Sequence, residues 1–194
     1  MLFLAGFLKA FFAIFGVMDP VGNVPPFLTL TGKLDRKARL ALATRAIIRA
    51  GAILTVFVFL GNGILNAFHI SIESFRIAGG IILVLLGLEI IFGFSLRNEA
   101  ASADDDISVV PLATPLIAGP GTITSAVILA KQYGYAVTLT GVAANLILSY
   151  ILFRYADVIL RLLGAKGTLV FAKVMGLILV AIGVEFIRSG LGAA

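Results

Sequence analysis

The sequence predicts an all-α integral membrane protein with six transmembrane helices arranged as two inverted-topology repeats of three helices. Three observations support this class: the apolar composition, an internal repeat, and a proline-rich interruption in each half. The chain has 194 residues, of which 60% are hydrophobic and 13% charged. A soluble domain of this length does not need so much apolar surface, so the chain is expected to reside in a bilayer.

Six apolar runs are long enough to cross a bilayer, which requires about 20 residues for a helix. The first run lacks a basic leading region and a small-residue cleavage site, so it is expected to be a retained helix rather than a signal peptide. The runs cover residues 2–30, 43–67, 75–94, 111–130, 136–163 and 168–187. Short loops join them, which leaves no room for a separate soluble domain.

The charges predict the orientation in the membrane. The formal net charge is +5, and eleven basic residues flank the gaps after spans one, three and five, against four on the other side. By the positive-inside rule, a multi-pass protein of the cell membrane with both termini outside is expected. This distribution argues against a nucleic-acid partner. The eleven are Lys33, Arg36, Lys37, Arg39, Arg45, Arg49, Arg97, Arg154, Arg161, Lys166 and Lys173.

The two halves of the chain resemble each other. GIILVLLGLEII (residues 80–91) and GLILVAIGVEFI (residues 176–187) match at seven of twelve positions with an offset of 96. The prolines form two clusters, with Pro20 and Pro120 each followed closely by glycine. Since each repeat has three helices, the second must enter the membrane from the opposite side, as in many secondary transporters. The predicted division is residues 1–97, an acidic linker 98–110, and residues 111–194.

Each half carries a helix break near the bilayer midplane. The stretch MDPVGNVPPF (residues 18–27) places Asp19 ten residues after Lys9 and fourteen before Lys33. These separations correspond to about 15 Å and 21 Å of helix. Gly119 is similarly central between Asp106 and Lys131. Proline and glycine disrupt the helix, and backbone groups freed at this depth require protein or water around them. Helices one and four are therefore expected to be broken.

The two breaks predict a site for a small dipolar ligand. A half-helix N-terminus favours a carboxylate, and the C-terminal carbonyls of the preceding half favour a cation or ammonium. Asp19 either holds the amino group, a coupling sodium or a coupling proton, or is only a helix cap. The threonines either bind ligand or bond back to their own helix. The candidate substrate-binding residues are Asp19, Pro20, Gly22, Asn23, Gly119, Pro120, Gly121, Thr122, Thr124 and Ser125.

Other polar residues in the spans are secondary candidates. Glu89 and Glu185 occupy equivalent repeat positions and are expected to anchor the helices or relay protons, with Glu185 paired to Arg188. Asn145 either bonds across helices or lines the path. Asp157 has the spacing of an interfacial ion pair with basic residues on its own helix, Arg154 and Arg161.

No enzyme, metal or cofactor is expected. The chain has no cysteine and no HExxH or GxSxG motif, and its one histidine, His69, lies in a loop. The acidic run at residues 104–106 supplies too few oxygen ligands for a hard cation and is expected to be a solvated linker.

Two stretches of the sequence resemble the signature segments of a known family. DPVGNVPPFLTLT (residues 19–31) and PLATPLIAGPGTIT (residues 111–124) are similar to those of the MarC family of bacterial and archaeal inner-membrane proteins. The resemblance covers the whole chain, in span number, length and motif order. It implies transport of small neutral amino acids such as glycine and alanine, driven by a proton or sodium gradient.

A small neutral substrate also agrees with the residues themselves, because glycines line the breaks and few charges lie near the midplane. Two alternatives stay open: a passive channel, and export of drugs or other small metabolites. A carrier saturates and shows counterflow, whereas a channel does neither. Resistance assays on cells with and without the protein separate drug export from nutrient transport.

Overall fold

The computed structural model describes residues 2–32, 34–93 and 117–192, which form seven helices. The acidic linker 98–110 and the part of the fourth span before residue 117 lie outside the described residues. The helices are α1 (Leu2–Met18), α2 (Val24–Thr31), α3 (Arg36–Ala67), α4 (Ile72–Phe92), α6 (Pro120–Tyr133), α7 (Tyr135–Arg154) and α8 (Ala156–Gly190). The prediction of an all-helical protein is confirmed for this part of the chain.

Four helical stretches are long and apolar enough to cross a bilayer. They are α3, α4, α7 and the Leu169–Gly190 part of α8. By contrast α1 has 17 residues and α6 has 14. At 1.5 Å per residue, α6 covers only about 21 Å, less than the hydrocarbon thickness of about 30 Å. α6 alone is therefore too short to form the whole of the predicted fourth span.

Local sequence accounts for where several helices start and stop. The Asp35 carboxylate accepts the Ala38 N–H at 2.7 Å and caps α3, and the Ser71 hydroxyl accepts the Ser74 N–H at 3.1 Å and caps α4. Such side-chain acceptors satisfy N–H groups that the first helical turn leaves without partners. Between α6 and α7 the chain reverses at Gly134, whose φ of 84° suits a residue without a Cβ.

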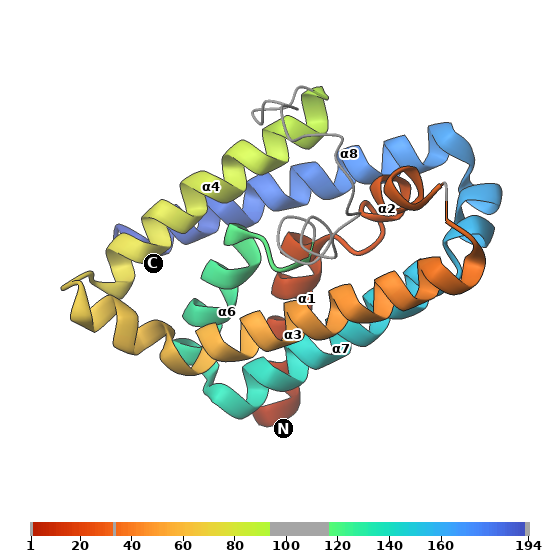
Figure 1. Ribbon diagram of the computed structural model, residues 1–194. Helices are drawn as coiled ribbons and strands as arrows, with labels where there is room; N and C mark the ends of the chain where they lie inside the picture. The colour runs from red at the N-terminus through yellow and green to blue at the C-terminus, as the bar shows by residue number, and fades with distance from the viewer. Residues whose placement is uncertain (1, 33, 94–116, 193–194) are drawn as a thin grey trace.

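Two antiparallel pairs of long helices enclose the short ones (Figure 1). α4 packs against α8, and α3 packs against α7, while α1 and α6 lie between these pairs. Side-chain contacts show the direction of each helix. The ring of Phe59, late in α3, lies beside the ring of Tyr135 at the start of α7, with centroids 5.3 Å apart, so α3 and α7 run antiparallel. Near the N-terminus, Gly6 of α1 lies against Val137 of α7, so the first part of α1 accompanies the first part of α7.

The start of α1 and the end of α8 lie at the same end of the bundle. Gly190, at the end of α8, lies against the carbonyl of Glu73 at the start of α4. The α3–α4 turn, the α6–α7 turn, the start of α1 and the end of α8 therefore share one end of the molecule. The opposite end holds the α2–α3 and α7–α8 connections, where Arg39 and Asp157 form an ion pair at 2.9 Å.

The contact between α4 and α8 is made by reciprocal glycines. A Cβ at Gly80 would lie 2.5 Å from the Gly183 carbonyl oxygen, and one at Gly183 would lie 2.7 Å from the Gly80 oxygen. Gly87 and Gly176 face each other in the same way, at 2.6 Å and 3.0 Å. Since helices gain little from hydrophobic burial within lipid, close backbone packing through small residues is a main source of their association.

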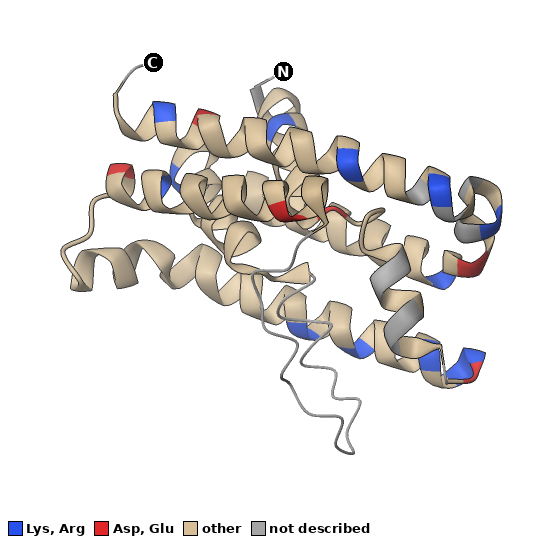
Figure 2. Cartoon of the chain, turned by 90° about the horizontal axis from the view of Figure 1, so that it is seen from above, with Lys and Arg blue, Asp and Glu red and all other residues tan. Residues whose placement is uncertain are grey.

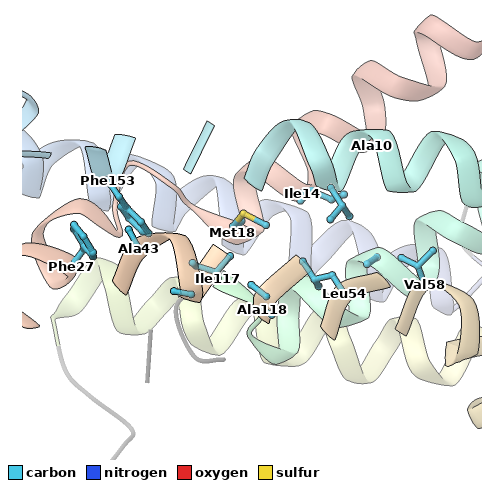
Figure 3. Close-up of a cluster of buried hydrophobic side chains, with 14 of the residues drawn as sticks. Ala10, Ile14, Met18, Phe27, Ala43, Leu54, Val58, Ile117, Ala118 and Phe153 are labelled. Carbon is cyan, nitrogen blue, oxygen red and sulfur yellow. The ribbon is translucent and has the colours of Figure 1, made fainter. Parts of the chain in front are cut away.

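The buried core surrounds the place where α1 ends. Phe27 of α2 and Phe153 of α7 stack with centroids 4.4 Å apart and planes inclined by 10°. Figure 3 shows them in one cluster with side chains from α1, α3 and the residues before α6. The labelled members are Ala10, Ile14, Met18, Phe27, Ala43, Leu54, Val58, Ile117, Ala118 and Phe153. Buried apolar packing thus holds the interrupted first span against its neighbours.

Two expectations about the last spans were wrong. The fifth run was expected to continue to residue 163, but α7 ends at Arg154 and α8 begins at Ala156. Asp157 was expected to pair with Arg154 or Arg161 on its own helix. It pairs instead with Arg39 of α3, and both carboxylate oxygens accept from one guanidinium nitrogen. The ion pair thus links two helices rather than successive turns of one.

The reciprocal glycines give a first prediction. Replacing Gly87 with alanine places a methyl group against the Gly176 carbonyl, so α4 and α8 must separate. Overpacking of this kind costs about 1–3 kcal/mol. We expect the midpoint of thermal unfolding, followed by circular dichroism in detergent micelles, to fall by several degrees. Gly63→Ala is the matched control, because a Cβ at exposed Gly63 meets nothing within 4 Å. Equal midpoints for both variants would contradict the packing described here.

Candidate functional site

The first span is interrupted within the five residues 19–23. α1 ends at Met18 and α2 begins at Val24, which confirms the break predicted in helix one. Asp19 has a positive φ of 42°, a conformation that aspartate tolerates better than most residues. Its Oδ1 accepts the Gly22 N–H at 3.0 Å, and its own N–H bonds to the Phe15 carbonyl at 2.9 Å. The side chain of Asp19 therefore stabilises the turn.

Asn23 closes the other side of this turn. Its Nδ2 donates to the Met18 carbonyl oxygen at 2.7 Å, and its N–H donates to the Asp19 carbonyl at 3.0 Å. The expectation that carbonyls at the end of α1 are free for a cation is therefore wrong for Met18. Asn23 caps this carbonyl in addition to any role in binding.

The turn requires glycine at position 22. A Cβ there would collide with the Asp19 carboxylate, so any side chain would displace one group or the other. Asp19 itself is only 7% exposed, and Pro20 is buried beside it. Within the described part of the chain no basic side chain pairs with Asp19. The carboxylate is thus buried with a backbone N–H as its partner.

The second glycine- and proline-containing stretch lies at the start of α6. Gly119 is extended, with φ −68° and ψ 168°, and Pro120 is the first helical residue. No side chain caps this N-terminus. Pro120 is exposed, whereas Gly119 and Gly121 are buried. The hydroxyl-bearing candidates of the first two turns, Thr122, Thr124 and Ser125, are all buried.

The break after α1 lies next to the start of α6. The end of α1 and the start of α6 meet where Val17 lies against Gly121, with 3.1 Å between Cγ1 and a Cβ placed at that glycine. The side chain of Leu83 from α4 fills the rest of this position. Gly121 therefore permits close packing here and does not leave open space for a ligand. A substitution at Gly121 is therefore expected to disturb the packing of Leu83 and Val17 directly.

The hydroxyl-bearing residues of α6 have different surroundings. The Thr124 methyl group occupies the position where a side chain at Gly79 would lie, so Thr124 packs α6 against α4. The Ser125 hydroxyl is fully buried and has no hydrogen-bond partner among the described residues. A buried polar atom without a partner costs stability and is uncommon. Ser125 is therefore the α6 hydroxyl that a ligand or water would satisfy.

Asn145 bridges α7 and α1. Its Nδ2 donates to the Phe11 carbonyl at 3.0 Å and to the Gly141 carbonyl at 2.9 Å. Its Oδ1 is buried without a partner in the described chain. One turn later, the Ser149 hydroxyl donates to the Asn145 carbonyl at 2.8 Å and contacts the sulfur of Met18 at 3.4 Å. Asn145 and Ser149 thus hold α7 against α1, at Phe11 and at Met18 next to the break.

Sequence reasoning missed Ser149 as a neighbour of the site. Its spacing was informative, because it lies four residues after Asn145 and both polar residues therefore share one face of an otherwise apolar helix. Leu83 and Val17 had no such signal, since an apolar residue in an apolar helix does not identify its partner.

The two glutamates are not brought together. Glu185 is exposed near the end of α8 and pairs with Arg188 at 3.0 Å, as expected from their spacing. Glu89 is half-buried near the end of α4, which runs antiparallel to α8, so the two carboxylates lie toward opposite ends of the pair. Among the residues described, no three His, Cys, Asp or Glu side chains cluster as metal ligands.

The turn at residues 19–23 gives a second prediction. Gly22→Ala should lower the unfolding midpoint in micelles by several degrees, because its methyl group collides with the Asp19 carboxylate. Asp19→Asn should leave the midpoint unchanged or raise it, since an amide oxygen also accepts the Gly22 N–H without the cost of burying a charge.

A double-mutant cycle isolates this interaction. In an Asp19→Ala background the collision is absent, so Gly22→Ala should cost less there than in the unmodified chain. Equal costs in both backgrounds would show that the carboxylate does not occupy the position described.

Known proteins similar to this chain are membrane proteins of one family. Residues 4–194 match the family described as "MarC family integral membrane protein". A UPF0056 membrane protein of Methanocaldococcus jannaschii is 37% identical, with 97% of each chain aligned. UPF0056 membrane protein YhcE of Escherichia coli is 36% identical, over 95% of this chain and 91% of its own. No solved structure matches significantly. From the full-length match and these identities, the chain belongs to the MarC family of integral membrane proteins.

Proposed function

We propose that the protein is a secondary active transporter of small neutral amino acids, similar to glycine or alanine, coupled to a proton or sodium gradient. The observation that carries this proposal is the buried Asp19 carboxylate in the turn that interrupts the first span, next to the end of α1 that meets the start of α6. Ionisable groups at membrane depth are costly and usually serve transport. The gradient couples to transport when this carboxylate takes up a proton or a sodium ion.

The facing helix ends suit a zwitterion. The C-terminal end of α1 carries partial negative charge, and the N-terminal end of α6 carries partial positive charge. These ends meet at Val17 and Gly121. An ammonium group would bind beside Asp19, while the N–H groups of Gly121 and Thr122, which no side chain caps, would receive the carboxylate. The unpaired Ser125 hydroxyl offers a further hydrogen bond.

An inverted repeat is the second part of the proposal, and the α4–α8 contact supports it. The repeat offset of 96 relates Gly80 to Gly176 and Gly87 to Gly183. The observed contacts pair Gly80 with Gly183 and Gly87 with Gly176. Applying the offset exchanges these two pairs, which is the reciprocal pattern of a two-fold interface. A pseudo-two-fold axis passing between α4 and α8 would relate residues 1–97 to residues 111–194.

The starts of the half-helices fit the same axis. Pro25 lies in the first turn of α2, and Pro120 begins α6. These prolines are 95 residues apart, close to the repeat offset, whereas the sequence-based pairing of Pro20 with Pro120 has a separation of 100. We therefore assign Pro25 as the counterpart of Pro120. Each repeat then has a proline in the first turn of its second half-helix, where the missing N–H costs no helical hydrogen bond.

The described conformation is closed around the proposed site. Leu83 and Val17 fill the position beside Gly121, and the stacked Phe27 and Phe153 are buried on the other side of the break. Binding therefore requires the end of α1 and the start of α6 to move apart. Rocking of one repeat against the other would open the site alternately toward each side of the membrane.

Transport in liposomes tests the function directly. Purified protein is reconstituted, and uptake of labelled glycine or alanine is followed under separately imposed proton and sodium gradients. We expect saturable, gradient-driven uptake and counterflow of unlabelled substrate. Flux that neither saturates nor shows counterflow would indicate a channel, and no flux of either amino acid would contradict the proposed substrate class.

The third prediction concerns Asp19. Asp19→Asn keeps an acceptor for the Gly22 N–H but removes the titratable, charged group, so gradient-driven uptake should fall at least tenfold and become insensitive to pH. Asp35→Asn is the matched control, since Asp35 also accepts a backbone N–H but is exposed at the start of α3. Undiminished coupled uptake by Asp19→Asn would exclude the carboxylate from the coupling mechanism.

A further inference from the structure

The first part of α8 is a separate short segment. Gly164, with φ 64° and ψ 169°, interrupts the helix, so residues 156–163 precede the break and the apolar span Leu169–Gly190 follows it. The segment follows directly on α7, which ends at Arg154. In Figure 1 the blue ribbon of α8 changes direction near the end where it joins α7. The segment therefore lies across the end of the bundle rather than along it.

The lengths of three helices indicate where the α7–α8 end of the bundle lies relative to the bilayer. Arg49 lies 18 residues before Ala67 in α3, Arg154 lies 19 residues after Tyr135 in α7, and Lys173 lies 17 residues before Gly190 in α8. At 1.5 Å per residue each distance is about 26–29 Å, close to the hydrocarbon thickness of about 30 Å. Arg154 therefore marks one bilayer boundary, and the segment 156–163, which follows Arg154 directly, begins at the level of the lipid headgroups.

The segment has an apolar face without cover from the described chain. Leu162 is 81% exposed, the highest value among the large apolar side chains described, and Val158 is 50% exposed. They are four residues apart and therefore lie on one face of the helix. Asp157 bonds to Arg39, which ties the segment to the start of α3. The segment is thus fixed in place while the side chains of Val158 and Leu162 remain exposed.

Basic residues surround this apolar face. Figure 2 shows most of the Lys and Arg residues toward the end where α7 joins α8. The exposed acidic side chains described at this end, Asp35 and Asp157, are already engaged with the Ala38 N–H and with Arg39. The exposed basic residues at and beyond the boundary are Arg36, Lys37, Arg45, Arg49, Arg154, Arg161, Lys166 and Lys173. The surface therefore has a strong positive charge beside an apolar edge.

We propose that residues 156–163 form an interfacial amphipathic element that binds anionic phospholipid headgroups. Val158 and Leu162 insert into the boundary between headgroups and acyl chains, while Arg161 and Lys166 bind the phosphate and the anionic headgroup. Arg161 follows Val158 by three residues and shares its face, so its long side chain can reach the phosphates while the apolar groups insert. Interfacial helices bind membranes through both apolar burial and charge. Each nearby basic residue strengthens association with an anionic lipid about fivefold. This inference does not depend on which solute the protein transports.

The chain has no tryptophan, so a single indole can report on the lipid beside this segment. Leu162→Trp is reconstituted into mixed phosphatidylcholine and phosphatidylglycerol bilayers in which one lipid or the other carries brominated acyl chains. Brominated lipid quenches tryptophan only in close contact. We expect brominated phosphatidylglycerol to quench at least twofold more strongly than its share of the bilayer predicts. The preference should weaken as salt is raised, because surface charge is screened.

Two variants provide the comparison. Neutralising the nearest charges with Arg161→Gln and Lys166→Gln, in the Leu162→Trp background, should abolish the preference for phosphatidylglycerol but retain quenching. Phe68→Trp is the matched control: Phe68 is 72% exposed in the turn between α3 and α4, at the opposite end of the bundle. Its quenching should follow the bulk lipid composition.

Several outcomes would overturn the proposal. Equal quenching by both lipids at Leu162→Trp, or the same preference at Phe68→Trp, would show no specific anionic-lipid surface. Absence of quenching by either lipid would mean that water or a second copy covers the segment, so that no lipid reaches it.

Discussion

The structure depends on how the backbone is satisfied where the first span stops being helical. Within hydrocarbon, water is unavailable, and an unpaired N–H or C=O group costs several kcal/mol. Residues 19–23 meet this demand internally: Asp19 accepts the Gly22 N–H, and Asn23 donates to the Met18 carbonyl. Because the turn supplies its own partners, the chain can change direction deep in the protein. α2 then reaches α7, where Phe27 stacks on Phe153.

Turn formation alone does not explain the charge of Asp19. An asparagine at this position would accept the same N–H and tolerate the same positive φ, without the larger cost of burying an ion. The described chain provides no basic side chain to offset that charge. Selection of a carboxylate over an amide at a buried turn is therefore best explained by a requirement for charge or titration. This distinction separates the structural contribution of Asp19 from its proposed part in coupling.

The sequence predicted those features that depend on local composition, and missed those that depend on lateral partners. The apolar runs located α3 and α4, and the Asp-Pro and Gly-Asn residues located the break before α2. By contrast, the fifth apolar run continues past Arg154 to residue 163 with only single charged residues among apolar ones, so the end of α7 could not be read from it. The partner of Asp157 lies 118 residues away, and local spacing favoured nearer arginines. Likewise Asn145 was recognised as polar and central, but its bond to the Phe11 carbonyl depends on how α1 crosses α7.

The glycine contact between α4 and α8 bears on how two repeats could rock. Each repeat would contribute one of these helices, so any relative motion must occur across this contact. Gly80 and Gly87 meet the backbone of Gly183 and Gly176, and the facing side chains of Val84 and Val180 are seated over these glycines. Such close packing on both helices resists their separation, so relative motion would turn about this contact rather than open it. At the start of α6, Leu83 and Val17 close over Gly121, and in the proposed motion they would withdraw as whole side chains. The first contact therefore suits a pivot, and the second suits the part of the molecule that opens.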